Sequence, residues 1–140
     1  RRAGCPDPIE VHGNHLGLHC PRCSLLDRRA AAPEEGFPTC ARCGSATKPP
    51  VVLFEESLPA GPLDQALRLA QRCDLMLVVG TSLAVYPVAS LPGIAAAAGA
   101  QLVEINTEPG HLRRLGAIEL TGGAAEVLPT LAARALALRS

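Results

Sequence analysis

Four cysteines occur as two pairs, Cys20-Pro-Arg-Cys23 and Cys40-Ala-Arg-Cys43, with sixteen residues between the pairs. Each C-x-x-C turn presents two thiolates from one short segment, and the loop between the turns lets the second pair complete a tetrahedron. This spacing is typical of four-cysteine zinc sites. The alternatives are two disulfides or four unrelated core thiols, but a 140-residue chain of ordinary globular composition needs no disulfide framework. We therefore predict one structural Zn²⁺ per chain, in closed coordination with no open position for water.

Three short segments of small and polar residues each follow an apolar run. They are Gly80-Thr81-Ser82, Asn106-Thr107-Glu108 and Gly122-Gly123-Ala124. Glycine allows close backbone approach, and hydroxyl, amide and carboxylate groups can bind ribose hydroxyls. One such segment alone is weak evidence because turns use the same residue types, but three at one sheet edge indicate a nucleotide-sized ligand. No G-x-G-x-x-G motif follows a first strand, so these 140 residues do not encode the phosphate-binding half of a dinucleotide site.

Apolar periodicity after Pro49 predicts the elements that would bring these segments together. Short apolar runs favour strands, and apolar residues at helical spacing favour amphipathic helices. We predict strands over Val51–Phe54, Asp74–Gly80, Gln101–Asn106 and Ala117–Leu120, with helices over 63–70, 87–98 and 124–138. The first strand is expected to be buried, and the second to be buried on both faces. The alternation of strands and helices indicates a parallel, doubly wound sheet with right-handed crossovers, whose ligands bind at the carboxyl ends of the strands.

The first third of the chain differs in composition from the rest. Residues 1–48 are rich in Gly, Pro, Cys and His and show little periodicity, as expected for loops held by a metal. We predict a zinc-ribbon subdomain over 1–48 and part of a Rossmann-like domain over 49–140. The predicted fold class is α/β, a partial doubly wound (Rossmann-like) parallel sheet with a small inserted four-cysteine zinc ribbon.

Charge and composition exclude several partners. The net charge is zero and the isoelectric point is about 7.1, which argues against a nucleic-acid partner and an anionic membrane. With two Phe and one Tyr, the chain has few side chains on which single-stranded bases could stack. No uninterrupted apolar run is long enough to span a membrane. Metal-bound cysteines favour a reducing compartment, so we expect a cytoplasmic protein. Because the chain opens at Arg1, without an initiator methionine, we expect the natural N-terminus to lie upstream.

The order and spacing of many short motifs resemble the sirtuins, the NAD-dependent protein lysine deacylases. The motifs are Arg2-Ala3-Gly4, Ile9–Asn14, both cysteine pairs, Pro50–Phe54, Leu58-Pro59, Val78–Ser82, Val85–Pro87, Val103–Asn106, Gly123-Ala124 and Val127-Leu128-Pro129. The sirtuin loop that cradles the NAD phosphates and the family's Gln-Asn-x-Asp segment do not occur in the sequence. The chain therefore resembles the C-terminal portion of a sirtuin, starting shortly before the catalytic histidine.

The resemblance implies roles for individual residues. His12 matches the family's catalytic histidine, a general base that acts on the ribose hydroxyls during acyl transfer. The implied NAD-binding residues are Gly80, Thr81, Ser82, Asn106, Thr107, Glu108 and Ala124. An acyl-lysine peptide is expected to insert as a strand between two segments, and the matching residues are Val52, Phe54, Glu55, Val85, Tyr86 and Pro87. Glu55 stands where the family has glycine; it either narrows the acyl-lysine tunnel or points to solvent after a small loop shift.

The other three histidines receive plainer interpretations. We expect His15 and His19 to lie at the surface or to pack against the ribbon, because four cysteines already complete the metal site. His111, in a Gly-His-Leu-Arg-Arg turn, is expected to be solvated. For His12 itself, the alternative to catalysis is a loop histidine that caps a turn before the zinc ribbon.

Two classes of function follow. The first is an NAD-dependent protein lysine deacylase, which transfers the acyl group from lysine to ADP-ribose and releases nicotinamide. Its partners would be NAD and an acyl-lysine protein or peptide, and the 140-residue chain alone is expected to be inactive without the phosphate-binding loop. The second is a non-catalytic zinc-ribbon, sirtuin-like binding module.

Overall fold

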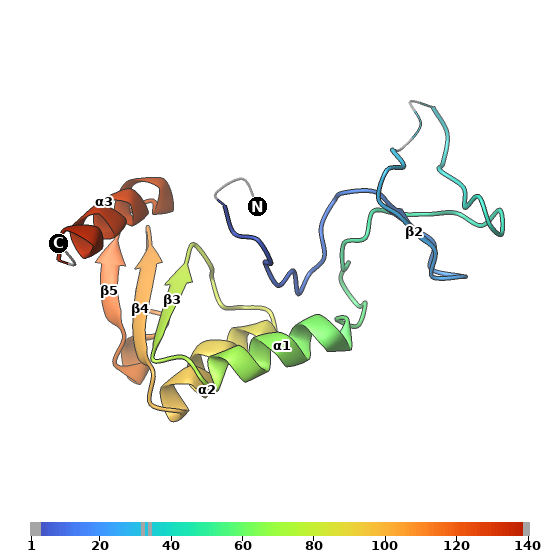
Figure 1. Ribbon diagram of the computed structural model, residues 1–140. Helices are drawn as coiled ribbons and strands as arrows, with labels where there is room; N and C mark the ends of the chain where they lie inside the picture. The colour runs from blue at the N-terminus through green and yellow to red at the C-terminus, as the bar shows by residue number, and fades with distance from the viewer. Residues whose placement is uncertain (1–3, 32, 34, 139–140) are drawn as a thin grey trace. The chain divides into compact units, whose positions relative to one another are not determined.

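The computed structural model describes residues 4–31, 33 and 35–138, and it divides into two compact units, Arg1–Pro62 and Leu63–Ser140. Figure 1 labels the helices and strands along the chain. Helix α1 (Ala60–Ala70) begins at the end of the first unit and continues into the second. No helix in the described part of the chain combines the length and hydropathy that a membrane span requires.

The first unit consists mostly of loops and turns. Its two short strands, β1 (Leu18–His19) and β2 (Leu26–Asp27), pair antiparallel. Three isolated bridges join other segments of this unit: Gly13 with Val51, His19 with Lys48, and Thr39 with Ala46. Among the described residues of this unit, the buried apolar ones are Leu18, Cys20 and Cys40. So small an interior cannot stabilise a fold by hydrophobic burial alone.

The predicted buried strand at Val51–Phe54 is wrong. Val51 makes a single bridge, and Leu53 and Phe54 are 55% and 93% exposed. Long-range pairing holds this segment in the first unit, because the Val52 N–H donates to the His12 carbonyl (3.0 Å) and Lys48 exchanges hydrogen bonds with His19. The first compact unit therefore extends to Pro62, beyond the boundary that we predicted after residue 48.

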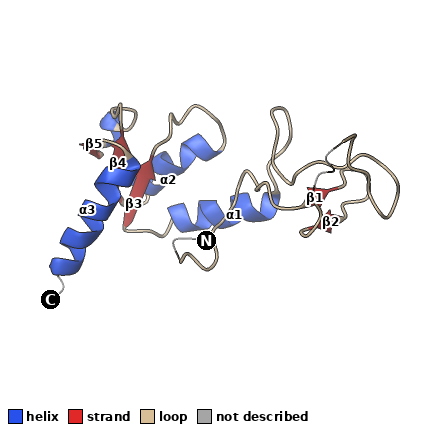
Figure 2. Cartoon of the chain, turned by 90° about the horizontal axis from the view of Figure 1, so that it is seen from above, coloured by secondary structure: helices blue, strands red, loops and turns tan. Residues whose placement is uncertain are grey.

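The second unit has the predicted α/β architecture. Strands β3 (Leu75–Val79), β4 (Gln101–Asn106) and β5 (Ile118–Thr121) form a parallel sheet in the order β3-β4-β5. The connections contain a 3₁₀ turn, η1 (Val88–Ser90), helix α2 (Leu91–Ala97), and a second 3₁₀ turn, η2 (Arg113–Leu115). Helix α3 (Ala124–Ala137) follows β5. Helices α1 and α2 lie on one face of the sheet and α3 on the other (Figures 1 and 2).

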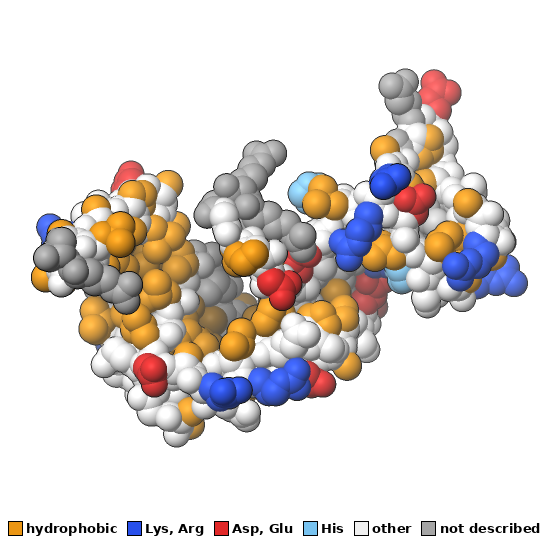
Figure 3. All heavy atoms as spheres, viewed as in Figure 1, with side chains coloured by type: hydrophobic (Ala, Val, Ile, Leu, Met, Phe, Trp, Pro, Cys, Tyr) orange, Lys and Arg blue, Asp and Glu red, His pale blue; other side chains and the backbone are white. Residues whose placement is uncertain are grey.

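The core of the second unit lies between the sheet and helices α1 and α2. Its buried members are Ala70, Val78, Ala95, Leu102 and Leu112. The expectation that β3 is buried on both faces is wrong, since Leu75 is 54% and Leu77 is 43% exposed. Alternate residues of a strand point to opposite faces, and α3 packs against β4 rather than over this edge strand. Hydrophobic side chains gather over the sheet and α3 in Figure 3.

Candidate functional site

The four cysteines of the two C-x-x-C turns form one cluster. Their sulfur atoms all lie within 4.8 Å of one another, with Sγ–Sγ distances of 3.6 Å for Cys20–Cys43 and 3.5 Å for Cys23–Cys40. A tetrahedral zinc ion with Zn–S bonds of about 2.3 Å requires sulfur atoms about 3.8 Å apart. No disulfide is present among the described cysteines. The cluster is therefore a four-cysteine metal site, and its donor set fits Zn²⁺.

The backbone of each knuckle closes in the same way. The Ser24 N–H donates to the Cys20 carbonyl (2.9 Å), and the Gly44 N–H donates to the Cys40 carbonyl (2.8 Å). Hydrogen bonds from Ser45 lower the pKa of Cys43 to about 6, which favours the thiolate. A thiolate with a lowered pKa is a ready metal ligand.

The loop that carries His12 is fixed by hydrogen bonds within the first unit. The His12 carbonyl accepts from the Val52 N–H (3.0 Å), and the Asn14 N–H donates to the Pro50 carbonyl (3.1 Å). Gly13 has a φ of +70°, and a Cβ there would lie 1.9 Å from the Pro50 carbonyl oxygen. Only glycine fits this close approach. The His12 side chain is exposed.

The Asn14 side chain supports the same loop. Its amide nitrogen donates to the Glu10 carboxylate, and its amide oxygen accepts from the Leu16 N–H (2.8 Å). Neither partner was expected from the sequence. The side chain of Asn14 therefore stabilises the loop, a role that could not be inferred from its position in the Ile9–Asn14 motif. His15 is exposed and His19 is half-buried beside β2, as expected.

The predicted peptide-binding residues occupy two exposed segments. Phe54 and Glu55 are exposed in the first unit, and Val85, Tyr86 and Pro87 are exposed in the second; Val52 is half-buried. Glu55 has a φ of +70° and thus adopts the left-handed conformation that glycine favours. Because the two segments belong to different compact units, insertion of a peptide between them stays a prediction.

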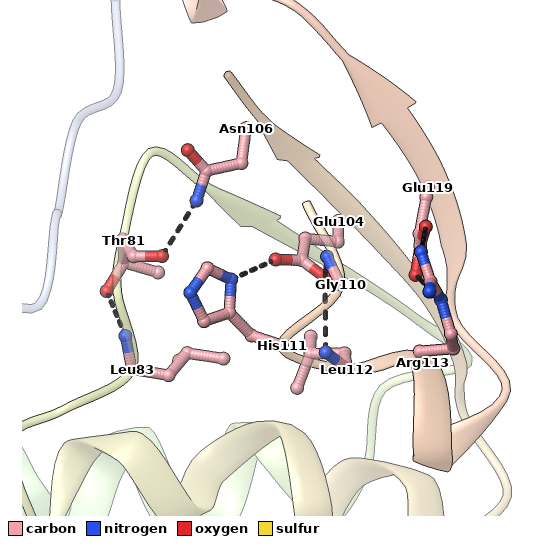
Figure 4. A network of polar contacts seen from close by, with 9 residues as sticks. All are labelled: Thr81, Leu83, Glu104, Asn106, Gly110, His111, Leu112, Arg113 and Glu119. Carbon is pink, nitrogen blue, oxygen red and sulfur yellow. Dashed lines mark hydrogen bonds and ion pairs between the residues drawn. The ribbon is translucent and has the colours of Figure 1, made fainter. Parts of the chain in front are cut away.

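The carboxyl ends of the three strands meet at one edge of the sheet. The Gly80 N–H donates to the Ile105 carbonyl (2.9 Å), and the Gly122 N–H donates to the Asn106 carbonyl (3.0 Å). The Asn106 side-chain amide crosses to the Thr81 carbonyl (2.9 Å), as Figure 4 shows. Asn106 therefore ties the ends of β3 and β5 together.

Most of the residues predicted to bind NAD are exposed to solvent at this edge. Those that are exposed are Gly80, Thr81, Ser82, Thr107 and Glu108, whereas Asn106 and Ala124 are half-buried. Ala124 is the first residue of α3, so the N-terminus of that helix lies directly after the end of β5. The structure brings these residues to one edge, and their contact with a cofactor stays a prediction.

One polar cluster at the same end of the sheet was missed by the sequence interpretation. Glu104, in the middle of β4, is 1% exposed and accepts hydrogen bonds from the Gly110 N–H (3.0 Å) and the Leu112 N–H (3.1 Å). His111 Nδ1 lies 2.7 Å from its other oxygen, so His111 is exposed as expected but also pairs with a carboxylate (Figure 4). The available signal was a glutamate inside the apolar run at 102–105.

These contacts determine the charge state of Glu104. Burial raises the pKa of its carboxyl, but the hydrogen bonds from His111, Gly110 and Leu112 outweigh burial and hold the pKa below its ordinary value. The carboxylate is therefore charged at neutral pH. A neighbouring ion pair joins Arg113 to Glu119 through two hydrogen bonds of 3.0 and 2.8 Å, and it links η2 to β5 at the surface.

Comparison with known proteins identifies close relatives. The model of the Sir2 family matches residues 1–87. An NAD-dependent protein deacylase of Pyrococcus furiosus is 42% identical over 137 residues, which cover 94% of this chain and 55% of the relative. NAD-dependent protein deacylase 1 of Pseudomonas aeruginosa is 41% identical over 145 residues, covering 96% of this chain and 57% of the relative. The chain thus spans about half the length of the curated relatives it matches.

Solved structures give the same result at the level of the fold. A Sir2 homologue in complex with NAD superposes with a TM-score of 0.93 at 36% identity, covering 99% of this chain and 55% of that one. A Sir2 homologue variant with bound ADP-ribose gives a TM-score of 0.89 at 37% identity, covering 98% and 57%. A Sir2 protein bound to a propionylated peptide gives 0.86 at 31% identity, covering 96% and 58%.

Proposed function

Because this chain belongs to the Sir2 family, we propose that it acts in an NAD-dependent protein lysine deacylase. In this reaction the acyl group moves from a lysine side chain to ADP-ribose, and nicotinamide is released. The chain would supply the general base, the structural zinc site, one side of the peptide-binding groove and the ribose side of the NAD site.

The main support for this proposal is the backbone hydrogen bonding between the loop that carries His12 and residues 50–52. Two backbone hydrogen bonds, from Val52 to His12 and from Asn14 to Pro50, join the loop of the proposed general base to one proposed peptide-binding segment, which supports the proposal. The exposed imidazole of His12 is of the side-chain type that most often accepts a proton from a substrate hydroxyl. Positioning of this kind accounts for a large part of enzymatic rate acceleration.

The sheet edge is the part of the chain suited to the cofactor. NAD, when bound, supplies the ribose carbon to which the acyl oxygen is joined. The Asn106 amide and the exposed hydroxyls of Thr81 and Ser82 offer hydrogen bonds to sugar hydroxyls, and the Glu108 carboxylate can accept further ones. The location agrees with the rule that parallel sheets bind ligands beyond the carboxyl ends of their strands.

We assign Zn²⁺ a structural role. Cys20, Cys23, Cys40 and Cys43 would hold the ion with four thiolates and would leave no position for a reacting water molecule. The described part of the first unit has few buried apolar residues, so the binding energy of the metal would replace a hydrophobic core.

The test uses this chain joined behind the upstream half of the Pyrococcus furiosus relative, called the joined protein below. It should release nicotinamide and deacylated peptide from NAD and an acetyl-lysine peptide, whereas the 140-residue chain alone should show little activity. His12→Ala should abolish the activity of the joined protein. The matched control is His15→Ala, which removes an exposed histidine from the same loop and should leave activity unchanged.

The outcomes separate the two classes of function. Full activity in His12→Ala would contradict the assignment of the general base. The non-catalytic binding module has one observation in its favour, the glutamate at position 55 where the family has glycine. It would gain support from a folded, zinc-loaded joined protein that binds NAD and an acyl-lysine peptide without any turnover.

A further inference from the structure

We propose that Glu104 is a positioning residue, which holds the loop Thr107–Leu112 in the shape that presents Thr107 and Glu108 to the ribose of NAD. This inference rests on the proposed function and names a residue that the assignments above leave without a role. Glu104 does not itself lie at the surface where a ligand binds, because its side chain is 1% exposed. It would act through the loop that it holds.

The carboxylate makes contact with three consecutive residues of the loop. One oxygen accepts from the N–H groups of Gly110 and Leu112, and the other lies against His111 Nδ1 (Figure 4). After leaving β4, the chain thus turns back and closes on a residue of that same strand. Gly110 has a φ of +128°, a conformation that side-chain-bearing residues rarely adopt, and there its N–H reaches the carboxylate.

The loop is also fixed at its start. Asn106 is the last residue of β4, and it is bonded to the Thr81 carbonyl and to the Gly122 N–H. Thr107 and Glu108 therefore lie between two fixed points, Asn106 on one side and the Glu104 contacts on the other. Both are exposed at the carboxyl end of the sheet. Short loops fixed at both ends lose little conformational entropy when a ligand binds.

The strand β4 does not by itself require a glutamate at position 104. Its neighbours in β4, Leu102, Val103 and Ile105, are buried apolar residues, so an apolar side chain would suit the same strand. Burying a carboxylate costs free energy, and here the hydrogen bonds from the Gly110 and Leu112 N–H groups offset that cost. The contacts with Gly110, His111 and Leu112 indicate that the carboxylate fixes the conformation of the loop.

The charged side chains beside this cluster are engaged with each other. Arg113 and Glu119 lie nearby, and they form an ion pair at the surface. Glu119→Gln is therefore a matched control, because it removes a carboxylate from the adjacent strand without touching the loop contacts.

The first measurement is amide hydrogen exchange on the 140-residue chain. In Glu104→Leu, no side-chain oxygen remains to accept their hydrogen bonds, so the Gly110 and Leu112 amides should exchange about tenfold or more faster. The Gly80 and Gly122 amides, bonded across the sheet, should keep their protection. Equal protection of Gly110 and Leu112 in both proteins would overturn the proposed contacts.

The second measurement is steady-state kinetics and ADP-ribose binding in the joined protein. Glu104→Leu should raise the KM for NAD and the Kd for ADP-ribose about tenfold, with kcat and the peptide KM nearly unchanged, because cofactor binding is lost equally in the ground state and the transition state. Glu104→Gln should have a smaller effect, since its amide oxygen can still accept. Glu119→Gln should change none of these. Unchanged NAD and ADP-ribose affinity in both Glu104 variants would overturn the inference and leave the proposed function intact. A joined protein that binds neither ligand, with Glu104 in place, would overturn both.

Discussion

Gly13→Ala offers the sharpest test of how the His12 loop is held. The new Cβ would lie 1.9 Å from the Pro50 carbonyl oxygen, and the atoms it meets are backbone, which cannot swing aside. The loop must therefore move away from the 50–52 segment. Such a shift breaks the hydrogen bonds from Val52 to His12 and from Asn14 to Pro50, both of which flank the substituted residue.

The expected loss of stability has two parts. An alanine at a left-handed φ of +70° costs about 1–2 kcal/mol. Each backbone hydrogen bond contributes about 1 kcal/mol net, so losing two adds about 2 kcal/mol. Gly36→Ala is the matched control, since Gly36 has a φ of +83° in the same unit, and a Cβ added there would meet no atom within 4 Å among the described residues. Gly36→Ala should lower the free energy of unfolding only by the conformational cost of the left-handed alanine.

The assay is denaturant unfolding of the 140-residue chain, with zinc release as the signal from the first unit. We expect Gly13→Ala to be about 2 kcal/mol less stable than Gly36→Ala. In the joined protein, a displacement of His12 by about 1 Å should lower kcat on the order of a hundredfold. Equal stabilities of the two variants, together with full activity of Gly13→Ala, would refute the reasoning that Gly13 is needed for the close approach to Pro50.

Three further predictions follow from other parts of the chain. Cys40→Ser should abolish zinc binding and unfold the ribbon but leave the parallel sheet protected, as elemental analysis and hydrogen exchange would show; one bound zinc in this variant would contradict the four-cysteine site. Because the folded-state pKa of Glu104 is lowered, its contribution to stability is present above the unfolded-state pKa and is lost as pH falls through the folded-state pKa. Denaturant unfolding measured between pH 7 and pH 3 should therefore show that the chain is more stable than Glu104→Gln at pH 7 and that this difference in stability shrinks as the pH falls. A difference that does not change with pH would argue against a charged Glu104. Glu55→Gly should stabilise the chain by about 1 kcal/mol, because it relieves a left-handed glutamate, and should lower the KM for an acyl peptide in the joined protein; a higher peptide KM would show that the Glu55 side chain helps binding.

The sequence alone determined the features that depend on local spacing. Two C-x-x-C turns are each a few residues long, so their geometry follows from the chain itself, and the four-cysteine cluster was predictable. The parallel sheet was predictable for a similar reason, because apolar periodicity identifies strands and helices one at a time. Strand β4 has the predicted limits, Gln101–Asn106.

The tertiary structure decided the features that depend on partners far along the chain. Val51–Phe54 has the composition of a buried strand, yet hydrogen bonds with residues 12–19 hold it outside the sheet and leave Phe54 exposed. Leu75 and Leu77 are as apolar as their neighbours, yet within these 140 residues they are exposed, because α3 packs against β4. Glu104 has its partners six to eight residues further along the chain, a separation that no helix or strand pattern pairs. Its charge is stabilised only because the loop after β4 turns back and brings three donors to it. No periodicity in the sequence predicts that turn.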